Sequence, residues 1–291
     1  MFGASVLFAI DDPEPTLRLV PQAGVNTIRI VDEIDWKSPN LLAAPFDERH
    51  WANVDRLLAL ARGSGLHVIL DVSSVRNLYL EHRMNPYVVD WGPFVRFVTS
   101  RVNTVTGVTY RDDPTIAMIS VAGEVDGLDQ PGPLYPTPAE LVEFYRRTFA
   151  QLREFDPNHL LSTGGLTHLD YPADIPWREI FALSDCDVVA IHTYSRGDEQ
   201  LTLPVVAAEA AAIGKPWINE EFGFKQGIGD SARATATERV YSESAAHGAA
   251  GVSIWNLGPQ VEGNPGVPET YDINESTPLT LATMRRHAPA S

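Results

Sequence analysis

Short apolar runs alternate along the chain with longer segments whose apolar residues recur at helical spacing. The short runs are rich in β-branched residues and end in glycine, proline or polar residues, which is typical of strands. We expect eight strands, over residues 2–10, 25–31, 67–72, 116–121, 160–163, 187–194, 215–223 and 251–256. Helices are expected over residues 13–23, 46–64, 91–103, 137–155, 177–183, 203–213, 232–246 and 278–287. Residues 73–90 are expected to form a long loop.

The expected strands are apolar almost throughout, as residues 25–31 illustrate. This pattern is typical of strands buried on both faces of a parallel sheet. Eight of them alternating with helices, without a linker or a shift in composition, predict one catalytic (β/α)8 TIM barrel domain over residues 1–291. A doubly wound open sheet is the competing architecture, and it is disfavoured because no G-x-G-x-x-G turn follows the first strand.

Composition narrows the expected partners. The formal net charge of −16 argues against nucleic acid and anionic membranes, because phosphate binding needs clustered Lys and Arg. Cys186 is the only cysteine, so no internal disulfide is possible. No apolar run approaches the roughly 20 residues of a transmembrane helix, and the N-terminus has no basic leader. We expect a cytoplasmic protein, or a secreted one if a leader has been removed, as a monomer or simple homo-oligomer without a metal or cofactor.

Polar residues stand at or near the carboxyl ends of the expected strands, where a barrel gathers its functional groups. They are Arg29, Asp71, Glu124, His192, Tyr194, Glu221 and Trp255. Two of the strands end in glutamate, although ionised carboxylates are poorly tolerated in a core unless they are paired or functional. A pair of such glutamates is what acid-base work on a glycosidic bond requires.

These residues carry a resemblance to a known family. The chain has a strand ending in Glu124, His-x-Tyr at 192–194, Lys-Pro-Trp-Ile-Asn-Glu-Glu-Phe-Gly at 215–223 and Ile-Trp-Asn at 254–256. In this order they resemble the retaining (β/α)8 glycoside hydrolases, most closely the mannan- and cellulose-active members of glycoside hydrolase family 5. The resemblance implies a hydrolase that cleaves β-1,4-mannosidic or glucosidic bonds in oligosaccharides or polysaccharides.

The resemblance also implies the roles of individual residues. Glu124 would be the acid/base, kept protonated by the negative charge of its partner, and Glu221 the nucleophile. Retention of configuration then requires the two carboxyl groups to lie about 5 to 5.5 Å apart. Because alternate residues of a strand face opposite sides, Glu221 is expected to share a face with Trp217 and Asn219, and Glu220 to face the helices in a supporting role with a hydrogen-bonded or cationic partner.

Further residues are expected to bind the substrate. Arg29 resembles the family's arginine that holds the nucleophile ionised, and a nearby opposite charge does favour an ionised carboxyl group. His192 and Tyr194 would hydrogen-bond sugar hydroxyls or the nucleophile, and Trp255 would form an apolar floor for a sugar ring. The remaining candidates lie on loops that should border the cleft: Trp36, His82, Trp91 and His168.

One position departs from the family pattern. Where the family has an asparagine that contacts the sugar 2-hydroxyl, just before the acid/base, this chain has Gly123. That contact is therefore missing or supplied by another residue, and a changed 2-hydroxyl pocket is compatible with a mannose-type substrate, since mannose and glucose differ at this carbon. Gly123 also leaves open a sugar-binding barrel with little or no turnover.

Other interpretations stay open at this point. Trp255, His192 and Arg29 each have a structural alternative as core or ion-pair residues, and Asp71 is expected to cap a loop. A metal-dependent barrel hydrolase is the second enzyme class, but it would need a His-x-His near the first strand, and residues 2–10 contain no histidine.

Overall fold

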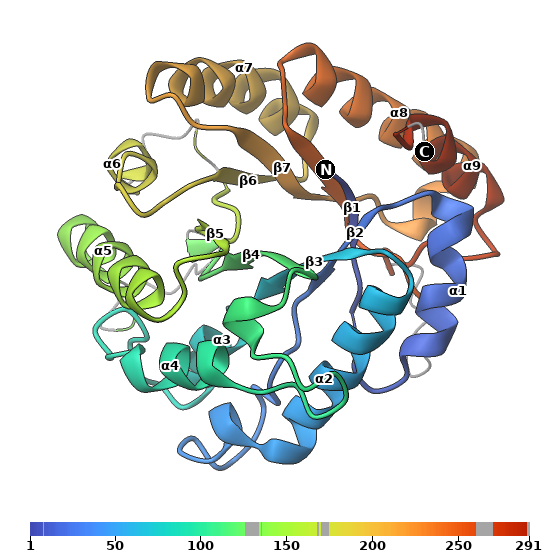
Figure 1. Cartoon of the computed structure of the whole chain (residues 1–291). Helices are drawn as coiled ribbons and strands as arrows, with labels where there is room; N and C mark the ends of the chain where they lie inside the picture. The colour runs from blue at the N-terminus through green and yellow to red at the C-terminus, as the bar shows by residue number, and fades with distance from the viewer. Residues whose placement is uncertain are drawn as a thin grey trace.

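The computed structural model describes residues 1–7, 9–125, 134, 136–167, 169, 175–259 and 270–289. Within these ranges a parallel sheet runs in the order β5-β4-β3-β2-β1-β8-β7-β6, with helices around it (Figure 1). Its strands are β1 (Phe2–Ser5), β2 (Thr27–Ile30), β3 (His67–Asp71), β4 (Ile116–Ser120), β5 (Leu160–Ser162), β6 (Val189–Thr193), β7 (Trp217–Phe222) and β8 (Gly251–Ile254). Parallel bridges from Ser162 to Val188 and from Leu166 to Ile191 bring β5 against β6. The predicted (β/α)8 barrel is confirmed.

The helices follow the strands in the expected alternation. They are α1 (Pro13–Ala23), α2 (Glu48–Gly63), α3 (Ser74–Glu81), α4 (Gly92–Ser100), α5 (Pro138–Phe155), α6 (Trp177–Phe181), α7 (Arg196–Ala212), α8 (Asp230–Ala246) and α9 (Pro278–His287), with short 3₁₀ turns at η1 (Ala44–Phe46), η2 (Tyr110–Asp112) and η4 (Gln226–Ile228). Helix α5 begins in a capping box between Thr137 and Glu140. Helix α1 ends at Gly24, whose φ of 73° is left-handed. Such caps explain why these ends could be predicted.

The structure corrects several of the expected bounds. The strands are shorter than expected, and β1 ends at Ser5 instead of continuing to residue 10. Helix α7 begins at Arg196, before the expected residue 203. Helix α3 occupies part of the expected loop 73–90, because Val75 and Leu78 stand three apart and are both buried in the core.

The apolar core has two parts. The larger part fills the space between the strands and the surrounding helices. The smaller part lies inside the barrel and consists of Ile69, Met118, Val188, Ala190 and Ile218. Polar side chains follow this inner cluster toward the carboxyl ends of the strands, which is where the site described below is built. No helix in the described ranges is both long and apolar enough to cross a bilayer.

Candidate active site

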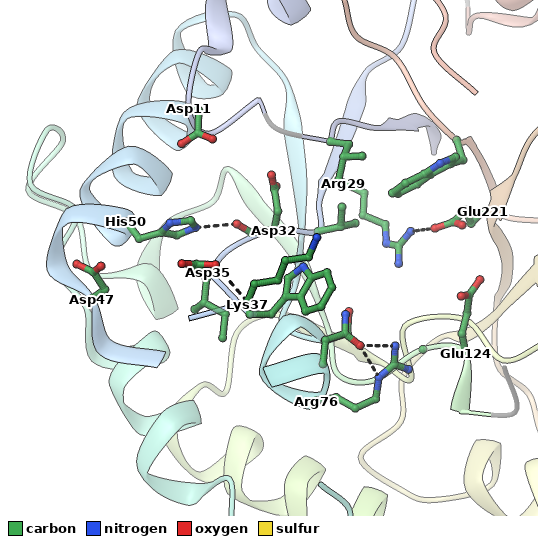
Figure 2. A pocket seen from close by; sticks show the side chains of 18 of the residues that line it. Asp11, Arg29, Asp32, Asp35, Lys37, Asp47, His50, Arg76, Glu124 and Glu221 are labelled. Carbon is green, nitrogen blue, oxygen red and sulfur yellow. Dashed lines mark hydrogen bonds and ion pairs between the residues drawn. The ribbon is translucent and has the colours of Figure 1, made fainter. Parts of the chain in front are cut away.

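A cavity of about 630 Å³ opens at the carboxyl ends of the strands (Figure 2). Its volume is typical of small-molecule sites, which range over ~300–1,000 Å³. Charged side chains make up much of its wall: Asp11, Arg29, Asp32, Asp35, Lys37, Asp47, Arg49, Arg76, Glu124 and Glu221. A charged cavity at this end of a barrel is a candidate active site.

The cavity brings together most of the residues that the sequence singled out. Those on its wall are Trp36, Arg29, Glu124, His192, Glu221 and Trp255. Tyr194 reaches the site through its hydroxyl, which donates to Glu221. In the described part of the chain, two candidates stay off the cavity wall: half-buried His82 hydrogen-bonds the Ser38 carbonyl at 2.9 Å, and Trp91 is buried in the outer core. His168 lies outside the described residues.

Glu221 is held at both carboxylate oxygens. Nη1 of Arg29 forms an ion pair with Oε2, and the Tyr194 hydroxyl donates to Oε1. Arg29 is fixed in turn by Asp71, whose Oδ2 lies 3.0 Å from Nε and 2.5 Å from Nη2. Asp71 also accepts from the Ser73 backbone at 2.8 Å, as expected for a loop cap. This leaves the carboxylate of Glu221 fixed in position and only 6% exposed.

Glu220 points into the barrel, so the prediction that it faces the helices is wrong. Where β6 pairs with β7, Ile191 lies opposite Asn219 and His192 opposite Glu221, which leaves Glu220 as an extra residue. Such a bulge interrupts the alternation of side chains along a strand. Both glutamates therefore reach the barrel interior.

The partners of Glu220 are also inside the barrel. Its side chain is fully buried, and Oε1 accepts from the Ser120 hydroxyl at 2.6 Å. Oε2 lies 3.9 Å from Nε of Arg29 and 3.5 Å from Nε2 of His192. Burial alone would raise the pKa of Glu220, but the charges of Arg29 and His192 outweigh it and lower the pKa. Glu220 thus has the hydrogen-bonded and cationic partners that a buried carboxylate needs.

Glu124 forms a pair with His192. Nδ1 of His192 lies 2.9 Å from Oε1 of Glu124. Burial disfavours a charged imidazole, but the charge of Glu221 and the contacts with Glu124 and Glu220 outweigh this and raise the pKa of His192 to about 10. Burial would likewise raise the pKa of Glu124, yet the hydrogen bond from His192 and its charge lower that pKa to about 2. Both shifts favour a proton on His192 over a proton on Glu124 in the free site, whereas the sequence led us to expect a protonated Glu124.

The two predicted catalytic carboxylates are close to each other. One oxygen of Glu124, one ring nitrogen of His192 and one oxygen of Glu221 all lie within 4.8 Å of one another. A metal ion would fit this spacing, but the guanidinium of Arg29 lies against Glu221 and would repel a cation. We therefore interpret the cluster as a site for proton transfer between organic groups.

The backbone at Gly123 excludes the family's asparagine. A Cβ atom at this position would come to 1.8 Å from the carbonyl oxygen of Gly164. The next residue, Glu124, has a φ of 53°, and its N–H donates to the Gly165 carbonyl at 2.8 Å. The segments after β4 and β5 are thus in direct main-chain contact. Position 123 cannot supply a side chain to the cavity unless this contact changes.

The sequence reasoning missed Arg76 as a residue of the site. It lies in α3 on the cavity wall, 8% exposed, where a loop was expected. Its guanidinium donates to the Asn77 side chain from Nε at 3.2 Å and from Nη2 at 3.0 Å. Figure 2 shows Arg76 on the side of the cavity that carries Glu124. The helical spacing of Val75 and Leu78 was the signal that could have placed it.

The raised pKa of His192 makes a prediction about stability. A histidine whose pKa rises from 6.5 in the unfolded chain to about 10 in the fold stabilises the fold fully below pH 6.5, and this contribution is lost as the pH rises toward 10. Between these pH values the wild-type protein should lose on the order of 3 kcal/mol more unfolding free energy than His192→Gln. Urea denaturation at several pH values measures this loss. The same dependence of the unfolding free energy on pH in both proteins would contradict the prediction.

Known proteins resemble the chain in sequence. A family model described as cellulase (glycosyl hydrolase family 5) matches residues 8–261. Mannan endo-1,4-beta-mannosidase 8 of Oryza sativa subsp. japonica is 32% identical over 110 residues, which are 37% of this chain. That match spans only 27% of the length of the rice protein.

Solved structures resemble it over nearly its whole length. The hyperthermostable endo-1,4-beta-D-mannanase of Thermotoga petrophila RKU-1 has a TM-score of 0.77 at 18% identity, covering 99% of this chain and 98% of its own. A substituted GH5_18 protein of Streptomyces cattleya, in complex with Manβ1-4GlcNAc, has a TM-score of 0.75 at 15% identity. The match covers 99% of this chain and 79% of the Streptomyces cattleya chain. These likenesses show the shared fold. Because the family model matches most of the sequence, the chain belongs to the cellulase family, glycosyl hydrolase family 5.

Proposed function

We propose that the protein is a retaining β-glycoside hydrolase in which Glu124 is the acid/base and Glu221 the nucleophile. The observation that carries this is the proximity of the two carboxylates, with oxygens within 4.8 Å of each other on the wall of one cavity. Retaining enzymes separate their carboxyl groups by about 5–5.5 Å, whereas inverting enzymes leave about 6.5–9.5 Å for a water. Membership of glycosyl hydrolase family 5 supports the same assignment.

In the first step Glu221 attacks the anomeric carbon, and the bond to the leaving oxygen breaks as Glu124 donates a proton to that oxygen. Arg29 and Tyr194 hold the two oxygens of Glu221, which aligns the nucleophile and limits its alternative conformations. The product of this step is a covalent glycosyl ester of Glu221.

In the second step Glu124 acts as a base on water. It removes a proton while the water oxygen attacks the anomeric carbon, and the ester bond to Glu221 breaks. Glu124 suits this step because its side chain is 42% exposed, whereas Glu221 is nearly enclosed. Two displacements at one carbon give net retention of configuration.

We further propose a β-mannosidic oligosaccharide or polysaccharide as the substrate. Trp36 and Trp255 line the cavity and offer apolar faces for sugar rings. The resemblance to a mannan endo-1,4-beta-mannosidase supports mannose over glucose. So does the disaccharide bound to the similar Streptomyces cattleya protein. His168 stays a candidate for sugar binding.

Replacing Glu124 by glutamine tests the acid role. An acid matters most when the leaving group is poor, so Glu124→Gln should lose about 10²–10⁴-fold in kcat/KM on phenyl β-mannoside or mannobiose. The loss on 2,4-dinitrophenyl β-mannoside, whose leaving group needs no proton, should be small. Steady-state rates on both aryl mannosides, with the corresponding glucosides and galactosides alongside, measure this.

The comparison within one variant controls for damage to the fold. Equal losses of kcat/KM on the substrates with the good and the poor leaving group would show that Glu124 is not the acid. A folded wild-type protein that binds mannobiose and cleaves none of these substrates would instead indicate a sugar-binding barrel without turnover.

A further inference from the structure

The two ring nitrogens of His192 face two different carboxylates. Nδ1 lies 2.9 Å from Glu124, and Nε2 lies 3.5 Å from Oε2 of Glu220. Nε2 of His192 and Oε2 of Glu220 are both buried, and neither atom has a closer hydrogen-bond partner in the described part of the chain. The ring is also confined on one side, since a Cβ atom at Gly165 would come to 2.0 Å from it. His192 is therefore fixed between Glu124 and the extra residue of the β7 bulge.

We propose that Glu220 is a positioning residue that acts through His192: its buried charge keeps His192 protonated, and His192 stores the proton that Glu124 uses. This inference rests on the proposed glycosidase function and adds a residue to it. It also gives the bulge in β7 a function, because without the bulge Glu220 and Glu221 would face opposite sides of the strand.

Three carboxylates and one guanidinium surround the ring of His192, and Glu220 is the carboxylate that faces its Nε2. The charged groups that face the ring are Glu124 from the end of β4, Arg29 from β2, and Glu220 and Glu221 from β7. Glu221 lies 3.9 Å from the ring, and its two oxygens are also held by Arg29 and Tyr194. Glu220 is hydrogen-bonded to the neutral Ser120 and lies 3.9 Å from Arg29, and its charge acts on His192 together with those of Glu221 and Glu124.

The proton transfer balances over the two steps. In the first, the N–H bond at Nδ1 of His192 breaks as an O–H bond forms on Glu124, and that proton passes to the glycosidic oxygen, which takes the electron pair of the broken C–O bond. In the second, Glu124 takes a proton from the attacking water and returns it to Nδ1. Glu220 stays ionised throughout, and its charge makes recapture of the proton by His192 favourable.

The pH dependence of Glu220→Gln tests this proposal. The substitution keeps the shape of the side chain and removes its charge, so the pKa of His192 should fall from its raised value toward 6.5. For phenyl β-mannoside, the basic limb of the kcat/KM profile should then move down by roughly one pH unit or more. For 2,4-dinitrophenyl β-mannoside, which needs no acid in the first step, the limb should stay in place.

A matched control separates this effect from damage to the fold. Asp156 is also a buried carboxylate bonded to a histidine, with Oδ2 at 2.6 Å from Nδ1 of His159, and it does not line the cavity. Asp156→Asn should lose stability without moving the basic limb on phenyl β-mannoside. A limb that moves equally on both substrates in Glu220→Gln, or moves as far in Asp156→Asn, would overturn the proposal.

A second measurement needs no turnover and no variant of Glu220. In ¹⁵N-histidine-labelled wild-type protein, both ring nitrogens of His192 should be protonated at pH 8, with the signal assigned by its absence in His192→Gln. A neutral His192 at pH 8 would overturn the proposed proton store even if the enzyme is active. If His192 is protonated but the protein has no turnover, the proposed storage of the proton on His192 is supported and only the proposed glycosidase function is contradicted.

Discussion

Glu221→Ala should lose about 10⁴-fold or more in kcat on every aryl β-mannoside, whatever the leaving group. The reason is that the covalent intermediate can no longer form, and a better leaving group does not replace a missing nucleophile. This independence from the leaving group distinguishes Glu221 from Glu124. Initial rates with phenyl and 2,4-dinitrophenyl β-mannoside measure both losses.

Added azide provides the decisive control for Glu221→Ala. The small anion can occupy the space that the carboxylate leaves and attack the anomeric carbon from the same side. The product should be the α-mannosyl azide, because a single displacement inverts the configuration. Formation of the β-mannosyl azide, or a variant that keeps much of the wild-type rate, would contradict the assignment of Glu221.

Arg29→Met should have the largest effect on stability, a loss of about 3–5 kcal/mol in the free energy of unfolding. Arg29 is 4% exposed and lies between Asp71, Glu220 and Glu221, all of them buried. Methionine fills a similar volume but leaves these carboxylates without their cation. Guanidinium denaturation at pH 7 measures the loss.

The ion pair between Arg56 and Glu14 offers the control for this prediction. Its two side chains are 49% and 48% exposed, so solvent screens the pair and Arg56→Met should cost only a small fraction of the loss expected for Arg29→Met. The deficit of Arg29→Met should also shrink as the pH falls and the stranded carboxylates take up protons. Equal losses for the two arginine variants would show that the buried cluster does not depend on Arg29.

Local sequence patterns, the spacing of apolar residues and the residues that cap helices, were enough to predict the barrel. Helices α1 and α9 have the bounds that were expected, because a proline near the start and polar or glycine residues at the ends mark them. Helix α3 was missed because it has only eight residues, in which Val75, Leu78 and Tyr79 make up little more than one turn of helical spacing. Short elements contain too few apolar positions for a period to be read.

The chemistry of the site depended on contacts that no local pattern shows. The orientation of Glu220 depends on one extra residue in β7, which reverses the alternation without altering composition. The pKa of Glu124 is lowered by His192, a hydrogen-bond partner 68 positions away in the sequence. The resemblance to a family supplied the identities of the two glutamates, whereas their charge states required the three-dimensional arrangement.

The close contact between Gly123 and Gly164 limits how this chain can evolve. A single substitution that introduces a side chain at position 123 meets the Gly164 carbonyl at 1.8 Å before it can gain any contact with a sugar. The backbone after β5 would have to move first, and that segment also carries Gly165 against the ring of His192. A side chain at position 123 therefore requires a shift of the same segment that confines the ring of His192, which couples the shape of the sugar pocket to the groups that transfer the proton.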